Sequence, residues 1–143
     1  MRRKIYALTG WFVLAAAAAF GQAPEGIRGT WVNERGATVV IITAGNLDIA
    51  ENVLRWGNCT YSGHRAIPEE GVYRLNIYEK EDGTVYASEL WGGNRWGGSR
   101  IEASFSLDDD GMLTITIENS AHDNTIKNGE YNGKQTFRLR KKA

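Results

Sequence analysis

The stretch Ser99–Glu118, with the sequence SRIEASFSLDDDGMLTITIE, decides the fold class of this chain. Apolar side chains occupy every second position from Ile101 to Leu107 and again from Leu113 to Ile117. A period of two is typical of a strand with one buried and one solvated face. Between the halves, Asp108-Asp109-Asp110-Gly111 favours a tight turn, because aspartate bonds its own backbone and glycine accepts positive φ. The stretch is therefore predicted to form a β-hairpin.

The same period of two extends over the rest of the chain. Two strands are predicted at Tyr73–Tyr78 and Thr84–Trp91, with a turn at Glu81-Asp82-Gly83 between them. Near the start, Thr30–Asn33 and Ala37–Thr43 are β-branched runs that are predicted to pair.

Four other segments complete this assignment. Val39–Ile42 shows no alternation and predicts a strand that is covered on both faces. Further strands are predicted at Cys59–His64 and Phe137–Arg140, whereas the apolar positions of Leu47–Trp56 fit either a strand or a short helix. The polar segment Asn119–Asn132 predicts a long exposed loop.

Roughly eight short strands linked by local turns predict an all-β fold. A small antiparallel up-and-down β-barrel fits best, because nearly every connection is a hairpin and closure leaves no open strand edge. An eight-stranded barrel has an interior that is either filled by side chains or holds one small ligand.

The N-terminal segment has the layout of a secretory signal peptide. Basic residues, Met1-Arg2-Arg3-Lys4, precede an apolar run, Ile5–Phe20, and small residues follow at Ala19 and Gly21. We predict a signal peptide at residues 1–21, a barrel domain at residues 22–143, and a secreted or periplasmic location. The alternative is an uncleaved anchor, the one expected link to a membrane, although the run is shorter than the roughly 20 residues of a spanning helix.

Charge and cysteine content limit the partners of the exported domain. The chain has 17 basic and 17 acidic residues, and removing Arg2, Arg3 and Lys4 leaves 14 against 17, a net charge of −3. This balance argues against nucleic acid as a partner, because duplex binding needs a basic surface. Cys59 is the single cysteine, so it is either buried or paired with another molecule. The oligomeric state is left open.

The tripeptide Gly29-Thr30-Trp31 resembles the G-x-W opening of the calycin barrels, the lipocalins and avidins. In lipocalins this tryptophan packs against an arginine of a late strand, so the resemblance implies a contact of Trp31 with Arg138 or Arg140. Such a contact would place a cation over an indole face.

Two longer segments resemble avidins in particular. Gly29–Thr38 is similar to the avidin opening, and Gly133–Phe137 is similar to the last avidin strand. Asn33 matches an avidin ligand position, whereas Ala37 replaces a serine and Gln135 replaces an aspartate. The resemblance thus implies a calycin-like barrel without the polar groups that hold biotin, and removing such partners weakens binding strongly.

A glycine-rich segment with two indoles, Trp91-Gly92-Gly93-Asn94-Arg95-Trp96-Gly97-Gly98, is the best candidate for a ligand site. In one interpretation, Trp91 and Trp96 close over an apolar or sugar-like ligand at the barrel mouth, and Arg95 or Arg100 pairs with an anionic group. In the other, the glycines allow bulges in a wide hairpin whose rings cap the core. Asn33 is the next candidate for a ligand contact.

Catalytic and metal motifs are not apparent in the sequence. His64 and His122 have no second ligand at metal-binding spacing, and His122-Asp123 is interpreted as a solvated turn. We therefore expect a binding protein for a small, partly apolar ligand, with no enzymatic activity, cofactor or metal. One alternative is a secreted protein-interaction module or inhibitor whose barrel is filled. Another is an enzyme that uses a carboxylate at the barrel mouth.

Overall fold

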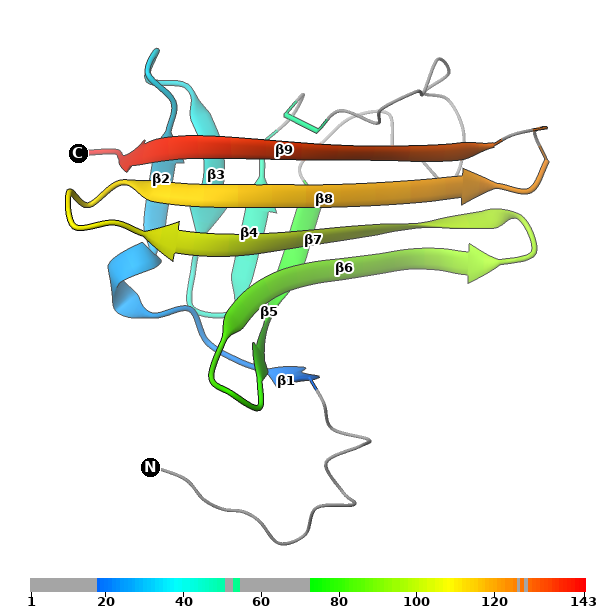
Figure 1. Ribbon diagram of the computed structural model, residues 1–143, viewed down its shortest axis with the longest axis horizontal. Coiled ribbons are helices and arrows are strands. Elements are labelled where there is room, and N and C mark those ends of the chain that lie inside the picture. Colours follow the sequence, from blue (N-terminus) through cyan, green and yellow to red (C-terminus); the bar gives the residue numbers. More distant parts are fainter. Residues whose placement is uncertain (1–17, 51–52, 55–72, 126, 128) are drawn as a thin grey trace, which may run out of the picture.

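The computed structural model of the protein describes residues 18–50, 53–54, 73–125, 127 and 129–143. Within these ranges nine strands form one antiparallel sheet (Figure 1): β1 (Ala18–Phe20), β2 (Gly29–Val32), β3 (Thr38–Ile42), β4 (Asn46–Ile49), β5 (Tyr73–Lys80), β6 (Val85–Asn94), β7 (Gly97–Leu107), β8 (Leu113–Asp123) and β9 (Glu130–Lys141). A short 3₁₀ turn, η1 (Glu25–Ile27), precedes β2. Within the described ranges, no helix has the length and apolar character needed to cross a membrane.

Strands β2 to β9 close into an up-and-down antiparallel barrel. Each of them pairs with the next strand in the sequence, and β9 returns to β2 through the pairs Trp31–Lys141 and Val32–Arg140. The all-β class and the closed eight-stranded barrel predicted from the sequence are thereby confirmed. The architecture is compatible with a calycin-like fold.

The β7–β8 turn shows how local chemistry fixes the register of a hairpin. Asp108 Oδ1 accepts hydrogen bonds from the backbone N–H groups of Asp110 and Met112, each at 2.9 Å. Gly111 has a φ of +80°, which side chains other than glycine rarely adopt. The turn aligns Leu107 with Leu113, so the apolar positions of both strands face the same side.

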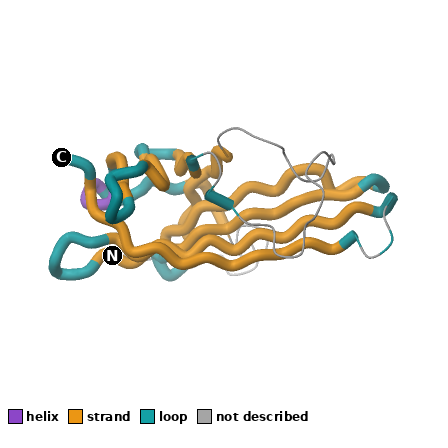
Figure 2. Tube along the Cα trace, turned by 90° about the horizontal axis from the view of Figure 1, so that it is seen from above, coloured by secondary structure: helices purple, strands orange, loops and turns teal. Residues whose placement is uncertain are grey.

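The eight barrel strands differ greatly in length. Strands β2, β3, β4 and β5 contain 4, 5, 4 and 8 residues, whereas β6, β7, β8 and β9 contain 10, 11, 11 and 12. Figures 1 and 2 show the four long strands continuing past the short ones toward the β6–β7 turn. We call this projecting part of β6–β9 the overhang.

The predicted loop at Asn119–Asn132 is wrong, because most of it belongs to the overhang. Strand β8 continues to Asp123 and pairs with β7 as far as Gly97, while β9 begins at Glu130 opposite His122. On the inner face of β8 the polar Asn119 and Asp123 flank Ala121, so the period of two is not visible in a hydropathy pattern. Pairing with the neighbouring strand, rather than burial of apolar side chains, keeps these residues extended.

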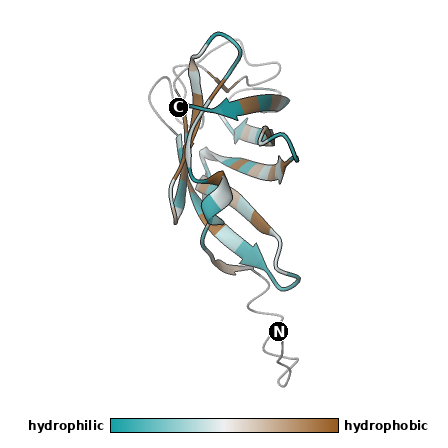
Figure 3. Ribbon diagram, turned by 90° about the vertical axis from the view of Figure 1, so that its left-hand side faces the viewer, coloured by the Kyte–Doolittle hydropathy of each residue, from teal (hydrophilic) through white to brown (hydrophobic). Residues whose placement is uncertain are grey.

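The core lies where the short strands cross the long ones. Its largest aliphatic members are fully buried residues on the inner faces of six of these strands, β3, β4, β5, β7, β8 and β9: Ile42, Leu47, Ile49, Leu75, Ile77, Ile101, Leu113, Ile115, Ile117 and Leu139. Brown and teal bands alternate along these strands in Figure 3, as expected for one buried and one solvated face. Burying one such side chain contributes roughly 1.5–3 kcal/mol, so this cluster dominates the stability of the barrel.

Strand β3 departs from the expected cover on both faces. Val39, Val40 and Ile42 are buried, but Ile41 is 41% exposed. The register shifts by one residue where β3 crosses β2, between Trp31 and Val32. This bulge allows the adjacent residues Val39 and Val40 to be buried together, whereas Ile41 keeps the outward position that the pleat gives it.

Trp31 closes one end of the core through a partner that the sequence analysis did not identify. Its side chain is 1% exposed, and its indole N–H donates a 2.8 Å hydrogen bond to the carbonyl of Ile27 in η1. The cation over its ring is Lys141, with Nζ 5.4 Å from the ring centre. The expected contact with Arg138 or Arg140 is wrong, because both arginines alternate with the inward-facing Leu139 and so point outward.

Strand β1 lies within the predicted signal peptide, whose residues 1–17 fall outside the described ranges. Phe20 pairs with Tyr78 of β5, their rings stack with centres 5.2 Å apart, and Tyr78 stacks on Tyr86 of β6 at 5.6 Å. Just after β1, the backbone N–H of Gly21 donates to the carbonyl of Ile77 at 3.0 Å. A cut after Gly21 would therefore remove β1 from its place beside β5. The strand predicted at Cys59–His64 lies outside the described residues.

Candidate functional site

The inner face of the long strands changes from apolar to polar at one level along their length. On β8 the inward positions run through Leu113, Ile115 and Ile117, all fully buried, to Asn119, which is 3% exposed. Polar side chains at positions that face a barrel interior are costly to bury. The pairing of β5 with β6 reaches Asn76 and Ser88. The next residue of β6, Glu89, is at the level of Asn119, so the overhang begins there.

Strand pairing brings further polar residues to the same level. Asn119 is opposite Ile101 of β7, and Ile101 is opposite Glu89 of β6. Gln135 of β9 faces Ile117, one inward position toward the core. Ser99 of β7 and Tyr131 of β9 lie one inward position farther toward the overhang. Each is opposite an inner-face residue of the neighbouring strand. We call Glu89, Ser99, Asn119, Tyr131 and Gln135 the inner polar belt.

Glu89 is the charged member of the belt. It is half-buried, and the two core residues nearest to it in register, Ala87 and Ile101, are 0% and 2% exposed. Within the described residues, no hydrogen bond or ion pair holds its carboxylate. Burial alone accounts for a pKa raised above the ordinary value of a glutamate. A carboxylate that faces inward, keeps some solvent contact and has no fixed partner is available for a ligand.

Gln135, the residue that stands where avidins have an aspartate, forms a hydrogen bond to the protein backbone. Its Nε2 donates a 2.7 Å hydrogen bond to the carbonyl of Val53. Val53 follows β4, and its side chain packs against the core. The contact ties the chain beyond β4 to β9 across the barrel, so Gln135 has a structural role here.

Asp123, at the end of β8, is 2% exposed and also has a structural role. Its Oδ1 accepts hydrogen bonds from the backbone N–H of Thr125 at 2.9 Å and from the Thr125 hydroxyl at 2.7 Å. The interpretation of His122-Asp123 as a solvated turn is therefore wrong. Both residues lie in β8, and Asp123 holds the first residues after the strand in place.

Three of the predicted ligand residues gather at the β6–β7 turn. The Arg95 guanidinium lies 4.5 Å from the ring centre of Trp96, which is 43% exposed. Trp91 is opposite Ser99 in the register. Asn124, just after β8, fixes the turn by donating from Nδ2 to the carbonyl of Arg95 at 2.9 Å.

The glycines of this segment form the bulge that the structural interpretation expected. The register between β6 and β7 shifts between Gly92 and Asn94. Gly93 and Gly97 have φ values of +78° and +143°. The bulge changes which face the following residues present, and it places Arg95 and Trp96 at the exposed end of the overhang.

Asn33, the fourth predicted ligand residue, lies far from the other three. Its Oδ1 accepts hydrogen bonds from the backbone N–H groups of Arg35 and Ala37 at 2.9 and 3.0 Å, and so shapes the β2–β3 turn. This turn follows Val32, which pairs with Arg140 near the C-terminal end of β9. The β6–β7 turn lies at the other end of the long strands, about 30 Å away at 3.3 Å per residue. One small ligand cannot contact both.

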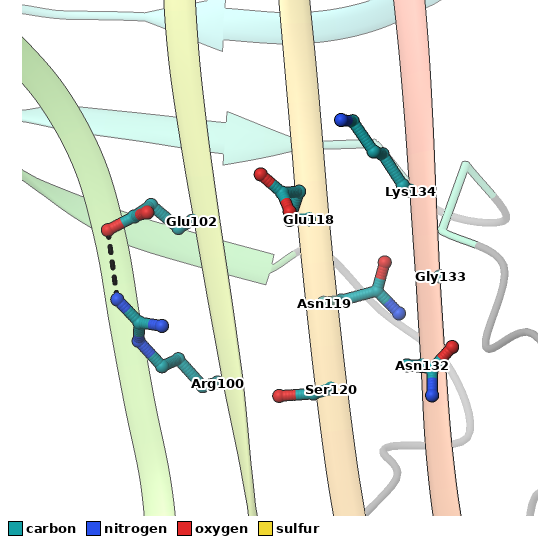
Figure 4. Close-up of a pocket in the computed structure, with 8 residues that line it drawn as sticks. All are labelled: Arg100, Glu102, Glu118, Asn119, Ser120, Asn132, Gly133 and Lys134. Carbon is teal, nitrogen blue, oxygen red and sulfur yellow. Dashed lines mark hydrogen bonds and ion pairs between the residues drawn. The ribbon is translucent and has the colours of Figure 1, made fainter.

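A polar hollow of about 390 Å³ lies on the outer face of β7, β8 and β9 (Figure 4). Arg100 and Glu102 form an ion pair along one side, with Nη2 and Oε2 3.0 Å apart. Glu118 and Lys134 are cross-strand neighbours on the other side. Positive and negative groups are mixed on this shallow surface, which is typical of a solvated sheet face. Arg100 therefore lies outside the barrel, away from the belt.

Other groups of the chain offer no metal site in the part that the structure describes. No three His, Cys, Asp or Glu side chains gather closely enough there to hold an ion. His64 and Cys59 lie outside the described residues.

No protein-family model, curated protein or solved structure matches this chain. The candidate site is thus defined by its own geometry.

Sequence reasoning missed Glu89, Ser99, Asn119 and Tyr131 as site residues. A usable signal was present in Thr84–Trp91, where strict alternation groups Glu89 with Val85 and Ala87 rather than with the outward positions. For Asn119 the signal was weaker, because the apolar run of β8 ends just before it.

Proposed function

We propose that this protein is an exported, non-catalytic binding protein, related in architecture to the calycins, that holds a small, partly apolar ligand. The inner polar belt is the observation that carries the proposal. It borders the apolar core directly, so a ligand seated there meets aliphatic side chains on one side and hydrogen-bonding groups on the other. Ligand sites of this kind are mostly apolar and contain a few polar groups that fix orientation.

Energetics support a ligand role for the belt. The interior of an eight-stranded barrel can be filled with aliphatic side chains. The inward positions of β7 and β8 on the core side of the belt are filled in this way. A carboxylate with no fixed partner, in place of these aliphatic side chains, lowers the stability of the folded protein without a compensating contact. Proteins keep such costly groups mainly at functional sites.

The β6–β7 turn would form the rim of the site. Trp91 is opposite Ser99 near the end of β6, and Trp96 and Arg95 lie at the exposed tip. We assign Trp91, Arg95 and Trp96 to ligand contact at this end. Asn33 remains a predicted contact only for a ligand at the opposite end.

The basic N-terminus and the apolar run after it support export by a signal peptide, and hence a secreted or periplasmic location.

A titration tests the proposal directly. Tryptophan fluorescence of the purified protein is followed while Nile red, decanoate and biotin are added separately. We expect a saturable change with Nile red or decanoate and none with biotin. Trp91→Phe and Trp96→Phe should weaken that binding several-fold, whereas Asn33→Ala should leave it unchanged. A flat response to all three compounds would overturn the proposal, and a loss confined to Asn33→Ala would move the site to the other end.

Exposed apolar side chains favour one alternative, a protein-interaction module. Leu90 is 76% exposed on the outer face of β6, and it borders a hollow of about 130 Å³ with Gly98 and His122. Under this alternative, Leu90→Ser would abolish capture of a partner protein from the same compartment and leave the small-molecule titrations unchanged.

A further inference from the structure

The charges that face the belt are negative. On the inner face of the overhang and its border, the charged side chains among the described residues are Glu89 and Asp123. Asp123 already accepts two hydrogen bonds from Thr125 through one oxygen. Glu89 is thus the carboxylate at this level that a ligand can meet.

Arg95 and Arg100, which the sequence analysis offered for an anionic ligand, lie elsewhere, and so does Lys141. Arg100 is on the outer face and pairs with Glu102. Arg95 lies over the Trp96 ring at the tip of the turn, several residues along β6 from Glu89. Lys141 is on the inner face of β9, but at the opposite end, over Trp31. Among the described residues, the sign of the charge at the belt therefore disfavours a carboxylate or phosphate ligand.

Aromatic and amide groups share the inner face with the carboxylate. Asn119 lies at the same register level two strands away, Tyr131 of β9 is 7% exposed, and Tyr73, packed against the core, begins β5 opposite Ile49 of β4. An ammonium group is attracted by a carboxylate and by the faces of aromatic rings, and an apolar chain attached to it would extend toward the aliphatic core.

We propose that the ligand of this protein is an amphiphilic amine, whose protonated nitrogen pairs with Glu89 while its apolar part lies against the core beside Ile101 and Leu75. This inference rests on the proposed binding function and specifies the chemical class of its ligand. The burial that raises the pKa of Glu89 fits the same picture, because a cation brought beside the carboxylate would favour its charged form.

A matched series of decyl compounds tests the inference. Decylammonium, decanoate and decanol share one apolar chain and differ in head-group charge. Their dissociation constants are measured at pH 7 by calorimetry, below the concentrations at which they form micelles. We expect decylammonium to bind about tenfold tighter than decanoate or more, as a charge-assisted contact predicts. Glu89→Gln should remove this preference.

The control variant removes the same charge from the other face of the sheet. Glu118→Gln lies on β8, beside Asn119 in the sequence, with its side chain exposed on the outer face. It should keep the full preference for decylammonium, which separates a local contact from a general effect of net charge. An equal loss of the preference for decylammonium in both variants would overturn the inference.

Other outcomes separate the two proposals. Binding of decanol and decanoate without preference for decylammonium would overturn the amine assignment and leave the binding function standing. Binding of none of the three would overturn both. Circular dichroism of Glu89→Gln, an isosteric change that removes a buried charge, confirms that the barrel remains intact.

Discussion

Glu89 and Leu90 are neighbours on β6, and each occupies the environment that would suit the other. Leu90 is 76% exposed on the outer face, while the carboxylate of Glu89 faces the barrel interior. A shift of one residue in register would correct both, but it would also turn Ala87 and Val85 outward. The pairing of β6 with both β5 and β7 therefore fixes Glu89 inside at a cost in stability.

Glu89→Gln should make the free protein more stable at pH 7. Burial raises the pKa of Glu89 above its ordinary value of 4.5, so above that range the folded state holds a charge that it disfavours. In the window between the two pKa values the folded state binds more protons, and stability falls as the pH rises. Urea unfolding should give Glu89→Gln the higher midpoint at pH 7 and equal midpoints at pH 4. A lower midpoint at pH 7 would show that the carboxylate has a stabilising partner.

Trp31→Phe should cost about 2–4 kcal/mol of unfolding free energy, because it removes buried ring volume and leaves the Ile27 carbonyl without its indole donor. Lys141→Met should cost less than about 1 kcal/mol, since a cation over an aromatic ring contributes little at an exposed site. Chemical denaturation of both variants tests the order. A larger loss for Lys141→Met would mean that the cation, rather than the hydrogen bond to η1, holds this end of the core.

The alternation of apolar residues and the chemistry of the turns are the two features of the sequence that predicted the fold well. The hairpin at Ser99–Glu118 combines strict alternation with a turn whose aspartate and glycine have defined roles, and both the strands and the turn are confirmed. Local chemistry sufficed there because each strand has one purely apolar face.

The overhang could not be predicted in the same way. Asn119, Asp123 and Tyr131 are buried on the inner face, so polarity no longer distinguishes inside from outside. Their extended conformation follows from the strand register, which is fixed by the apolar parts of β7 and β8 nearer the core. Similarly, counting alternate positions from Phe137 and Leu139 leads to Lys141, not to an arginine, as the inward cation near Trp31. Functional sites are where local rules are expected to fail, because a ligand replaces the missing apolar contacts.

Asp108→Asn should lose stability above pH 4 and regain the wild-type value in stronger acid. The hydrogen bond from Arg138, 2.7 Å between Nη2 and Oδ2, is the main cause that lowers the pKa of Asp108, followed by the bond from the Met112 backbone N–H. A lowered pKa stabilises the folded state above the ordinary value of 3.8, and this contribution is lost as the pH falls through the folded pKa. Urea midpoints of both proteins between pH 2 and 7 should converge at the acid end. Parallel curves over the whole range would exclude the ion pair as the cause.

Gly97→Ala should destabilise the barrel far more than Gly93→Ala, although both glycines lie in the β6–β7 segment with positive φ. A Cβ at Gly97 would overlap the carbonyl oxygen of His122 on β8, so the strand pair would have to separate at the overhang. Backbone strain and overpacking together should cost about 2–5 kcal/mol. At Gly93 a Cβ would meet open space, so the φ value alone should cost about 1–2 kcal/mol. If the overhang positions the ligand rim, Gly97→Ala should also weaken Nile red binding, whereas Gly93→Ala should not. Equal stability of the two variants would contradict the close approach of β7 and β8 at this point.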